Sequence, residues 1–314
     1  MQVIDTLAAL DQAKLDNVVV ALGNFDGVHL GHRKLIGQAI EQAKELAASS
    51  VVLTFNPHPL KLLAPEKFPK LLSTYAQRVE MFRQLGVDIV ILLPFSLELA
   101  NLSPRQFVTQ VLLEKLHAVH VCVGFNYSFG KGGQGTAENL GEFGRELNFG
   151  VTIVEQALRH GKIISSTEIR DALEHGEIEE AHDFLGYWPT ITGKVVRGDQ
   201  RGRLIGFPTA NLEPPDDLLI PTRGVYAAWA RVGGKVWPAM VNIGLNPTFK
   251  LDNEYRIETH IFNFGRNIYG ERLDLIFRKK LREERKFNGI AELRSQLTKD
   301  KLIAGNVLQA NTKA

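Results

Sequence analysis

Residues 23–32 have the sequence Gly23-Asn24-Phe25-Asp26-Gly27-Val28-His29-Leu30-Gly31-His32 and connect an apolar run at 17–22 with an amphipathic helical pattern. If the two histidines lie in the first turn of that helix, they share a face with its unpaired backbone amides, which attract anions. The three glycines leave room for a ligand to approach the backbone. This corner is therefore suited to a nucleoside triphosphate.

The chemistry expected of the corner is charge stabilisation. Residues 17–32 contain no Cys or Ser nucleophile, so His29 and His32 favour stabilising a charged transition state over covalent catalysis. A simpler interpretation is a strand-to-helix turn whose histidines only cap the helix. The surrounding glycines favour the phosphate-binding interpretation.

Composition bounds the class of protein. The 314 residues are 44% hydrophobic, which is enough for a full core, and the length favours two domains. Thirty-seven basic residues balance 35 acidic ones, and no block of five or more basic residues occurs. This balance indicates small-molecule partners and neither nucleic acid nor a membrane, while the oligomeric state is not indicated.

The same features predict a cytoplasmic protein. The N-terminus carries Asp5 and Asp11 in place of a basic leader, and apolar runs such as 89–93 stop at Pro94, short of a membrane span. Cys122 is the single cysteine, which excludes internal disulfides. Its position in the apolar run 119–123 predicts a small buried side chain without a catalytic role.

The first half alternates β-branched runs with helical patterns. Helical spacing is clear at 35–46 and, after a possible cap at Thr74, at 75–85, and Ser103-Pro104 is a good start for a third helix. Repeated β-α units predict a parallel sheet with helices on both faces, and ligands bind such sheets outside the carboxyl ends of the strands. The predicted strands are 17–22, 51–55, 87–93, 119–124 and 151–154.

The second half has a different texture. Gly233-Gly234 between two strand-like runs predicts a tight hairpin, and Ile290, Leu293 and Leu297 lie on one face of a terminal helix. We predict an antiparallel barrel or sandwich, joined to the first half after a short acidic helix at 177–185. The predicted strands are 191–197, 225–232, 236–243, 256–262 and 272–280, and the predicted domains are 1–186 and 187–314.

A second anion site is predicted at Ile164-Ser165-Ser166-Thr167-Glu168-Ile169-Arg170. Consecutive hydroxyls at a helix N-terminus bind phosphate, and Arg170 lies one turn further on, where its forked donors reach the same anion. The alternative is an ordinary Ser/Thr cap followed by a surface arginine. Beside the histidine corner, the phosphate interpretation is favoured.

Residues 130–135 match G-x-G-x-x-G, but residues 126–129 separate them from the preceding strand, so they are not a dinucleotide-binding turn. We predict a flexible loop over a nucleotide site. Phe125, Tyr127 and Phe129 either pack within this loop or contact a planar ligand. Asn126, just beyond a strand end, is the better candidate for a polar ligand contact.

In the second half, the run Gly198-Asp199-Gln200-Arg201-Gly202-Arg203-Leu204-Ile205-Gly206-Phe207-Pro208-Thr209-Ala210-Asn211 is the most informative. Its glycines supply backbone amides for phosphates, and Thr209 and Asn211 supply two neutral oxygen ligands for Mg²⁺. No Gly-Lys pair in the chain is followed by Ser or Thr, so a Walker-type loop is absent.

Strand alternation in Arg256-Ile257-Glu258-Thr259-His260-Ile261-Phe262 places Glu258 and His260 on the face opposite Ile257 and Ile261. Most often such a face is only the solvent face of a strand. On a barrel whose cavity binds a ligand, Glu258 becomes a candidate general base.

Together these runs resemble the bacterial bifunctional riboflavin kinase/FMN adenylyltransferases, also called prokaryotic FAD synthetases, over essentially the whole chain. The G-x-F-D-G-x-H-x-G-H corner and the I-S-S-T-x-I-R run resemble the ATP-binding elements of the adenylyltransferase domain. The G-R-x-x-G-F-P-T-A-N segment, residues 241–249 and the strand with Glu258 resemble the kinase domain. The resemblance implies an α/β Rossmann-like nucleotidyltransferase domain followed by an antiparallel β-barrel riboflavin kinase domain with a C-terminal helix.

The resemblance also implies the roles of individual residues. The implied catalytic residues are His29, His32, Arg170 and Glu258, and the implied metal ligands are Thr209 and Asn211. The implied substrate-binding residues are Gly23, Asn24, Phe25, Asp26, Gly31, Asn126, Ser165, Ser166, Thr167, Gly202, Arg203, Gly206 and Pro208.

Two reactions are implied. ATP would phosphorylate riboflavin to FMN, with Glu258 accepting the hydroxyl proton and Mg²⁺ neutralising the phosphates. The FMN phosphate would then attack the α-phosphate of a second ATP, releasing pyrophosphate and forming FAD, a step that needs positioning and charge neutralisation more than a base. The alternatives are a flavin-binding sensor with degenerate catalysis and another H-x-G-H nucleotidyltransferase that acts on tRNA, although the chain has no K-M-S-K-S-like loop.

Overall fold

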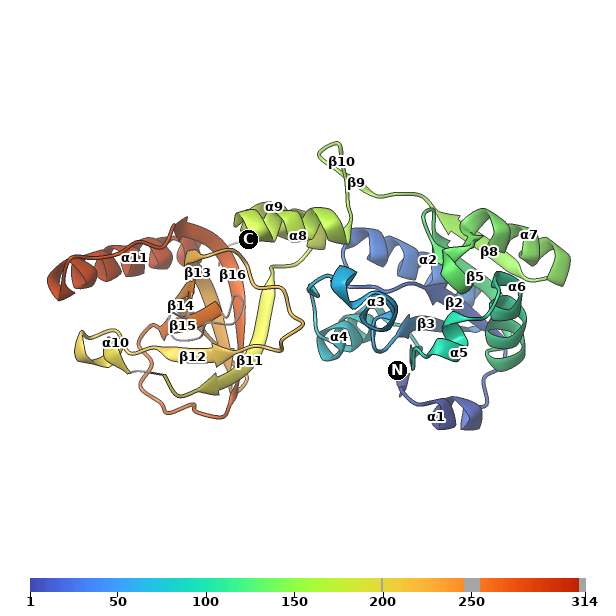
Figure 1. Cartoon of the computed structure of the whole chain (residues 1–314), viewed down its shortest axis with the longest axis horizontal. Coiled ribbons are helices and arrows are strands. Elements are labelled where there is room, and N and C mark those ends of the chain that lie inside the picture. Colours follow the sequence, from blue (N-terminus) through green and yellow to red (C-terminus); the bar gives the residue numbers. More distant parts are fainter. Residues whose placement is uncertain (199, 246–254, 311–314) are drawn as a thin grey trace. The chain divides into compact units, whose positions relative to one another are not determined.

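The computed structural model describes residues 1–198, 200–245 and 255–310. The chain divides into two compact units (Figure 1). The first unit comprises Met1–Lys70 and Thr74–Ser165, and the second comprises Leu71–Ser73 and Ser166–Ala314. No helix within the described residues is both long enough and apolar enough to cross a membrane.

The first unit is built on a parallel sheet, as the alternating β-α pattern predicts. Its six strands have the order β1-β4-β3-β2-β5-β8. All five residues of β2 are buried, because helices cover both faces of such a sheet. The strands are β1 (Gln2–Ile4), β2 (Val18–Leu22), β3 (Ser49–Phe55), β4 (Ile89–Leu93), β5 (Ala118–Gly124) and β8 (Gly150–Val154). The short β1 was not predicted.

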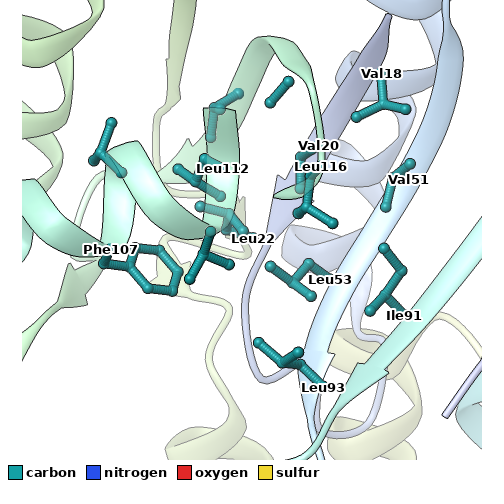
Figure 2. Packing of buried hydrophobic residues seen from close by; sticks show 14 of the residues in the cluster. Val18, Val20, Leu22, Val51, Leu53, Ile91, Leu93, Phe107, Leu112 and Leu116 are labelled. Atoms are coloured by element: carbon teal, nitrogen blue, oxygen red, sulfur yellow. The ribbon is translucent and has the colours of Figure 1, made fainter. Parts of the chain in front are cut away.

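Helices cover the sheet on both faces. On one face, α2 (Leu30–Glu45) and α4 (Tyr75–Leu85) pack buried side chains such as Ile36 and Phe82 against the strands. On the other face lie α1 (Leu7–Gln12), α7 (Ala137–Leu147) and η2 (Phe107–Lys115), and Figure 2 shows Phe107 and Leu112 in the same cluster as the strand residues. The remaining short helices are α3 (Pro59–Leu63), η1 (Pro65–Lys67), α5 (Leu97–Ala100) and α6 (Pro104–Gln106).

The predicted helix starts are confirmed. Thr74 and Ser103 each form a capping box with the residue three positions on, which satisfies backbone donors in the first turn. The helix that begins at Pro104 continues through η2 as a nine-residue π-helix.

The segment 128–136, predicted as a flexible loop over a nucleotide site, forms a hairpin. Strands β6 (Ser128–Phe129) and β7 (Gly135–Thr136) pair around the turn η3 (Lys131–Gly133). Phe129 is buried against Phe107, and a Cβ at Gly130 would lie 2.7 Å from the nitrogen of Pro104. Because Gly130 has no Cβ, the hairpin packs closely against Pro104.

The second unit contains a closed antiparallel barrel with the order β11-β12-β15-β14-β13-β16, which decides between the predicted barrel and sandwich. Gly233 and Gly234 form the expected two-residue turn, with φ values of 56° and 74° that favour glycine. The strands are β11 (Thr190–Val196), β12 (Ala210–Glu213), β13 (Gly224–Val232), β14 (Lys235–Leu245), β15 (Tyr255–Ile261) and β16 (Arg272–Arg282). The four-residue β12 was not among the predicted strands.

Helices complete the second unit. The terminal helix α11 (Ile290–Ala310) packs against β13, β14 and β16. The pair α8 (Ser166–His175) and α9 (Ile178–Leu185) belongs to this unit, whereas the predicted boundary at 186/187 assigns it to the first domain. The other elements are α10 (Arg201–Leu204) in the second unit and the two-residue strands β9 (Leu158–Arg159) and β10 (Lys162–Ile163) in the first.

Candidate active sites

The turn after β2 forms a tight corner at the carboxyl edge of the parallel sheet. Phe25, Gly27 and Val28 all have positive φ angles, and the amide of Val28 donates to the carbonyl of Phe25 over 3.1 Å. His29 is the N-cap of α2, and His32 lies in its first turn. The expectation that both histidines sit at the start of this helix is therefore confirmed, with His29 one residue before it.

The two imidazoles are stacked and hydrogen-bonded to the helix. Their ring centroids are 3.5 Å apart, and Nδ1 of His29 accepts the backbone N–H of His32 at 3.2 Å. Because Nδ1 accepts, a neutral His29 carries its proton on Nε2. The ring thus caps the helix through Nδ1 and carries an N–H on Nε2.

His32 is held in its neutral form. Burial lowers its pKa well below 6.5, and electrostatic interactions with the neighbouring His29 and Arg78 lower it further. Its Nδ1 is buried and has no hydrogen-bond partner among the described residues. His32 therefore acts as a neutral polar group at physiological pH.

Arg78 supports this corner through a hydrogen bond to its backbone, and the sequence prediction missed this residue. Its side chain is buried, Nη1 donates to the carbonyl of Asn24 at 2.9 Å, and its guanidinium lies 4.0 Å from the ring centre of Tyr75. Thr54 donates to the same carbonyl at 3.1 Å. A visible signal was the placement of Arg78 three residues after Tyr75 and four before Phe82, on the apolar face of α4.

The other predicted residues of this corner have different surroundings. The ring of Phe25 is fully buried and meets His32 edge-on at 5.3 Å, so it supports the imidazole from within the core. Asp26 is buried as well, whereas the side chain of Asn24 is exposed. A Cβ at Gly31 would lie 3.2 Å from two atoms of the His29 ring, and one at Gly23 would lie 3.0 Å from the Phe25 ring.

Asn126 follows the carboxyl end of β5, which pairs with β2 in the sheet. Its side chain is exposed, and its neighbour Tyr127 stacks on the buried Phe129. Packing therefore accounts for Phe129, while Phe125 is 45% exposed.

The Ser/Thr run opens a helix as predicted. Ser165 ends the first unit, and α8 begins at Ser166 in the second. Thr167 is exposed, Arg170 is half-buried, and Ile169 between them is fully buried and anchors the helix.

A row of polar residues crosses three strands of the barrel. Glu258 on β15 lies opposite Asn211 on β12 and opposite Asn242 on β14. Directly paired residues project to the same face, so the carboxyl group and two amides are neighbours. Asn242, which the sequence prediction did not single out, was recognisable only from this register. Nη2 of Arg256 lies 2.9 Å from Oε1 of Glu258, and both side chains are partly exposed.

Two glycines of the Gly-rich run lie close to β12 and to the residues that precede it. A Cβ at Gly198 would lie 2.2 Å from Nδ2 of Asn211, and one at Gly202 would lie 2.3 Å from the carbonyl oxygen of Phe207 and 3.5 Å from Oγ1 of Thr209. Gly198 therefore allows close approach to Asn211, a predicted metal ligand, and Gly202 allows close approach to the backbone of Phe207. Arg203, Gly206 and Pro208 are exposed. Residues 199 and 246–249, also part of the motifs, lie outside the described residues.

Known proteins resemble this chain over nearly its whole length. The model of the FAD synthetase family matches residues 11–168, and that of the riboflavin kinase family matches residues 185–308. The bifunctional riboflavin kinase/FMN adenylyltransferase of Listeria monocytogenes is 45% identical over 90% of both chains. The Escherichia coli K12 protein of that name is 34% identical over 97% of both. The crystal structure of a Streptococcus pneumoniae protein described as a macrolide-efflux protein superposes with a TM-score of 0.87 at 33% identity, over 98% of this chain and 99% of the other.

Proposed function

Since the chain belongs to the bifunctional riboflavin kinase/FMN adenylyltransferase family, we propose which residues perform its two reactions. The enzyme phosphorylates riboflavin to FMN with ATP and adenylylates FMN to FAD. The observation that carries the assignment is the separation of two polar sites: the histidine corner of the first unit and the Glu258 row of the second. Each reaction takes place at one of them.

Glu258 is the general base of the kinase. The ribityl 5′-hydroxyl of riboflavin donates its proton to this carboxylate as its oxygen attacks the γ-phosphorus of ATP, and ADP leaves as the bond from the γ-phosphorus to the bridging oxygen breaks. Arg256 holds one carboxylate oxygen at 2.9 Å and so orients the other. Asn211 and Asn242 flank the base and supply amide groups for the substrates. Gly202, Arg203, Gly206 and Pro208 form the loop that receives the phosphates.

Mg²⁺ fits the oxygen donors near this base. Mg²⁺ binds one or two carboxylates together with neutral oxygens and substrate phosphates, and Asn211 lies directly opposite Glu258. Thr209 and Asn211 would hold the ion. When bound, it would neutralise phosphate charge. Among the described residues no cluster of three His, Cys, Asp or Glu side chains could hold a metal ion.

The histidine corner binds the second ATP. The Nε2–H of His29 donates to the phosphates at the N-terminus of α2, and burial keeps His32 neutral beside it. By the family resemblance alone, Ser165, Ser166, Thr167 and Arg170 are the residues that stabilise the α-phosphate when the FMN phosphate attacks it and pyrophosphate leaves. The turn formed by Gly23, Asn24, Phe25, Asp26 and Gly31 shapes this site, and Asn126 contacts a substrate at the same sheet edge.

Two substitutions test the assignment. Glu258→Gln keeps the shape of the side chain but cannot accept the proton, so riboflavin phosphorylation should be lost while supplied FMN is still converted to FAD. Arg170→Ala should give the reverse result. Chromatography of the flavin products distinguishes the outcomes, and equal loss of both reactions in a folded variant would refute the division. The domain boundary at 186/187 and the cytoplasmic location stay predictions.

A further inference from the structure

His260 lies two residues after Glu258, on the same face of β15. Such a strand face is most often a solvent face, yet the histidine is only 6% exposed. Its Nδ1 is 2.8 Å from the carbonyl oxygen of Pro208. A carbonyl oxygen only accepts hydrogen bonds, so Nδ1 must carry the proton.

The bond lies where the backbone ladder between β12 and β15 ends. The last residue pair of that ladder is Ala210 with Thr259. Pro208 has no backbone N–H, so it cannot extend the pairing as a donor. The imidazole therefore links β15 to Pro208, which directly precedes Thr209. Thr209 in turn leads into β12 at Ala210.

The surroundings of the ring favour one orientation. Phe207 meets it edge-on at 5.2 Å, and Phe262 packs against it at 5.7 Å. Nε2 is buried and has no hydrogen-bond partner among the described residues. If the proton were on Nε2 instead, the lone pair of Nδ1 would face the carbonyl oxygen, and the contact would be repulsive. The site thus requires a single tautomer.

We propose that His260 is a positioning residue of the kinase site, whose Nδ1–H holds Pro208 and thereby keeps Thr209 in register with Glu258. The inference rests on the proposed role of Glu258 in phosphorylation. His260 itself touches no reacting atom; it acts through the carbonyl that precedes Thr209. Small displacements of a positioned group can lower a rate by about 100-fold, so the bond is expected to influence turnover.

Three substitutions separate the hydrogen bond from simple packing. In His260→Asn the amide nitrogen occupies the position of Nδ1, in His260→Gln it reaches that of Nε2, and His260→Phe keeps only the ring. We expect kcat for riboflavin phosphorylation to stay within about threefold in the Asn variant and to fall about 10- to 100-fold in the Gln and Phe variants. Conversion of supplied FMN to FAD should be unchanged in all three. Phosphorylation at the normal rate by the Phe variant, or an equal loss in the Asn and Phe variants, would overturn the proposal.

A measurement on the unmodified protein does not depend on how the variants fold. Nitrogen-15 NMR identifies which ring nitrogen of His260 carries the proton, and we expect Nδ1; a proton on Nε2 would overturn the proposal. Glu258→Gln distinguishes a wrong role for His260 from a wrong proposed function. If phosphorylation survives in that variant, the assignment of the base is wrong, whereas its loss together with normal activity of the Phe variant rejects only the role of His260.

Discussion

Replacing Gly31 by alanine should slow the conversion of FMN to FAD while the free energy of unfolding changes little. The new Cβ would lie 3.2 Å from Cε1 and Nδ1 of His29 and 3.6 Å from the carbonyl oxygen of Ile164. Contacts of 3.2 Å are tighter than ordinary van der Waals contacts, so the ring must give by a few tenths of an ångström. The bond from the His32 amide to Nδ1, already 3.2 Å long, would then weaken as the ring moves away from its present position.

The expected effect on activity is large and the effect on stability is small. A displaced His29 should slow the conversion of FMN to FAD by about 10- to 100-fold. A helical alanine stabilises by about 1 kcal/mol relative to glycine, and partial loss of the cap costs about 0.5–1 kcal/mol. The free energy of unfolding should therefore change by less than about 0.5 kcal/mol.

Gly37 in the same helix provides a matched control. A Cβ at Gly37 would meet no atom within 4 Å, so Gly37→Ala should stabilise the protein by about 0.5–1 kcal/mol without changing either rate. Thermal unfolding and chromatographic rates for both reactions are measured on the two variants. If Gly31→Ala forms FAD as fast as Gly37→Ala, or slows riboflavin phosphorylation equally, the reasoning about His29 is wrong.

Three further predictions concern pH, the terminal helix and the barrel. The folded-state pKa of His32 lies below its unfolded value of 6.5, so its contribution to the free energy of unfolding is fully present above about pH 6.5 and decreases as the pH falls toward the folded pKa. Asp300→Ala should cost about 3–5 kcal/mol in urea unfolding, because it leaves Arg282 without the buried carboxylate that lies 2.8 Å away. A fragment of residues 166–314 should phosphorylate riboflavin without forming FAD, and it should melt higher than 187–314 because α9 packs against β16.

Each of these has its own control. His32→Phe should reduce the loss of stability between pH 7.5 and pH 5 relative to the unmodified protein, and an unchanged loss would contradict the assignment to His32. Glu283 forms an ion pair with Lys280 but is 76% exposed, so Glu283→Ala should cost less than about 1 kcal/mol; a similar cost at Asp300 would contradict the argument from burial. Equal melting of the two fragments would show that α9 does not stabilise the barrel.

The fold was predictable where periodicity carries the information. Alternating β-α units predicted the parallel sheet, because strands buried on both faces are continuous apolar runs such as β2. Barrel closure was not predictable, because the alternation within each strand is the same in a barrel and a sandwich. Strand β12 escaped notice since it is four residues long and follows a Gly-rich run.

The candidate sites were predictable in their motifs but not in their supports. His29, His32 and Glu258 stand out as polar groups at strand ends or on one strand face. The contact of Arg78 with the Asn24 carbonyl joins residues 54 apart in the chain, and the bond between His260 and Pro208 joins residues 52 apart. Such long-range contacts leave only an indirect signal, in this chain a charged residue on an apolar helix face or a histidine on an apparent solvent face.

One chain uses two ATP molecules in sequence, and the flavin substrate attacks the γ-phosphorus of the first and the α-phosphorus of the second. The most direct test is incubation of the purified protein with riboflavin, Mg²⁺ and ATP radiolabelled at either the γ or the α position. We expect the γ label to appear first in FMN and then in FAD, and the α label to appear only in FAD. Failure of the γ label to enter FMN, or of the α label to enter FAD, would contradict the account.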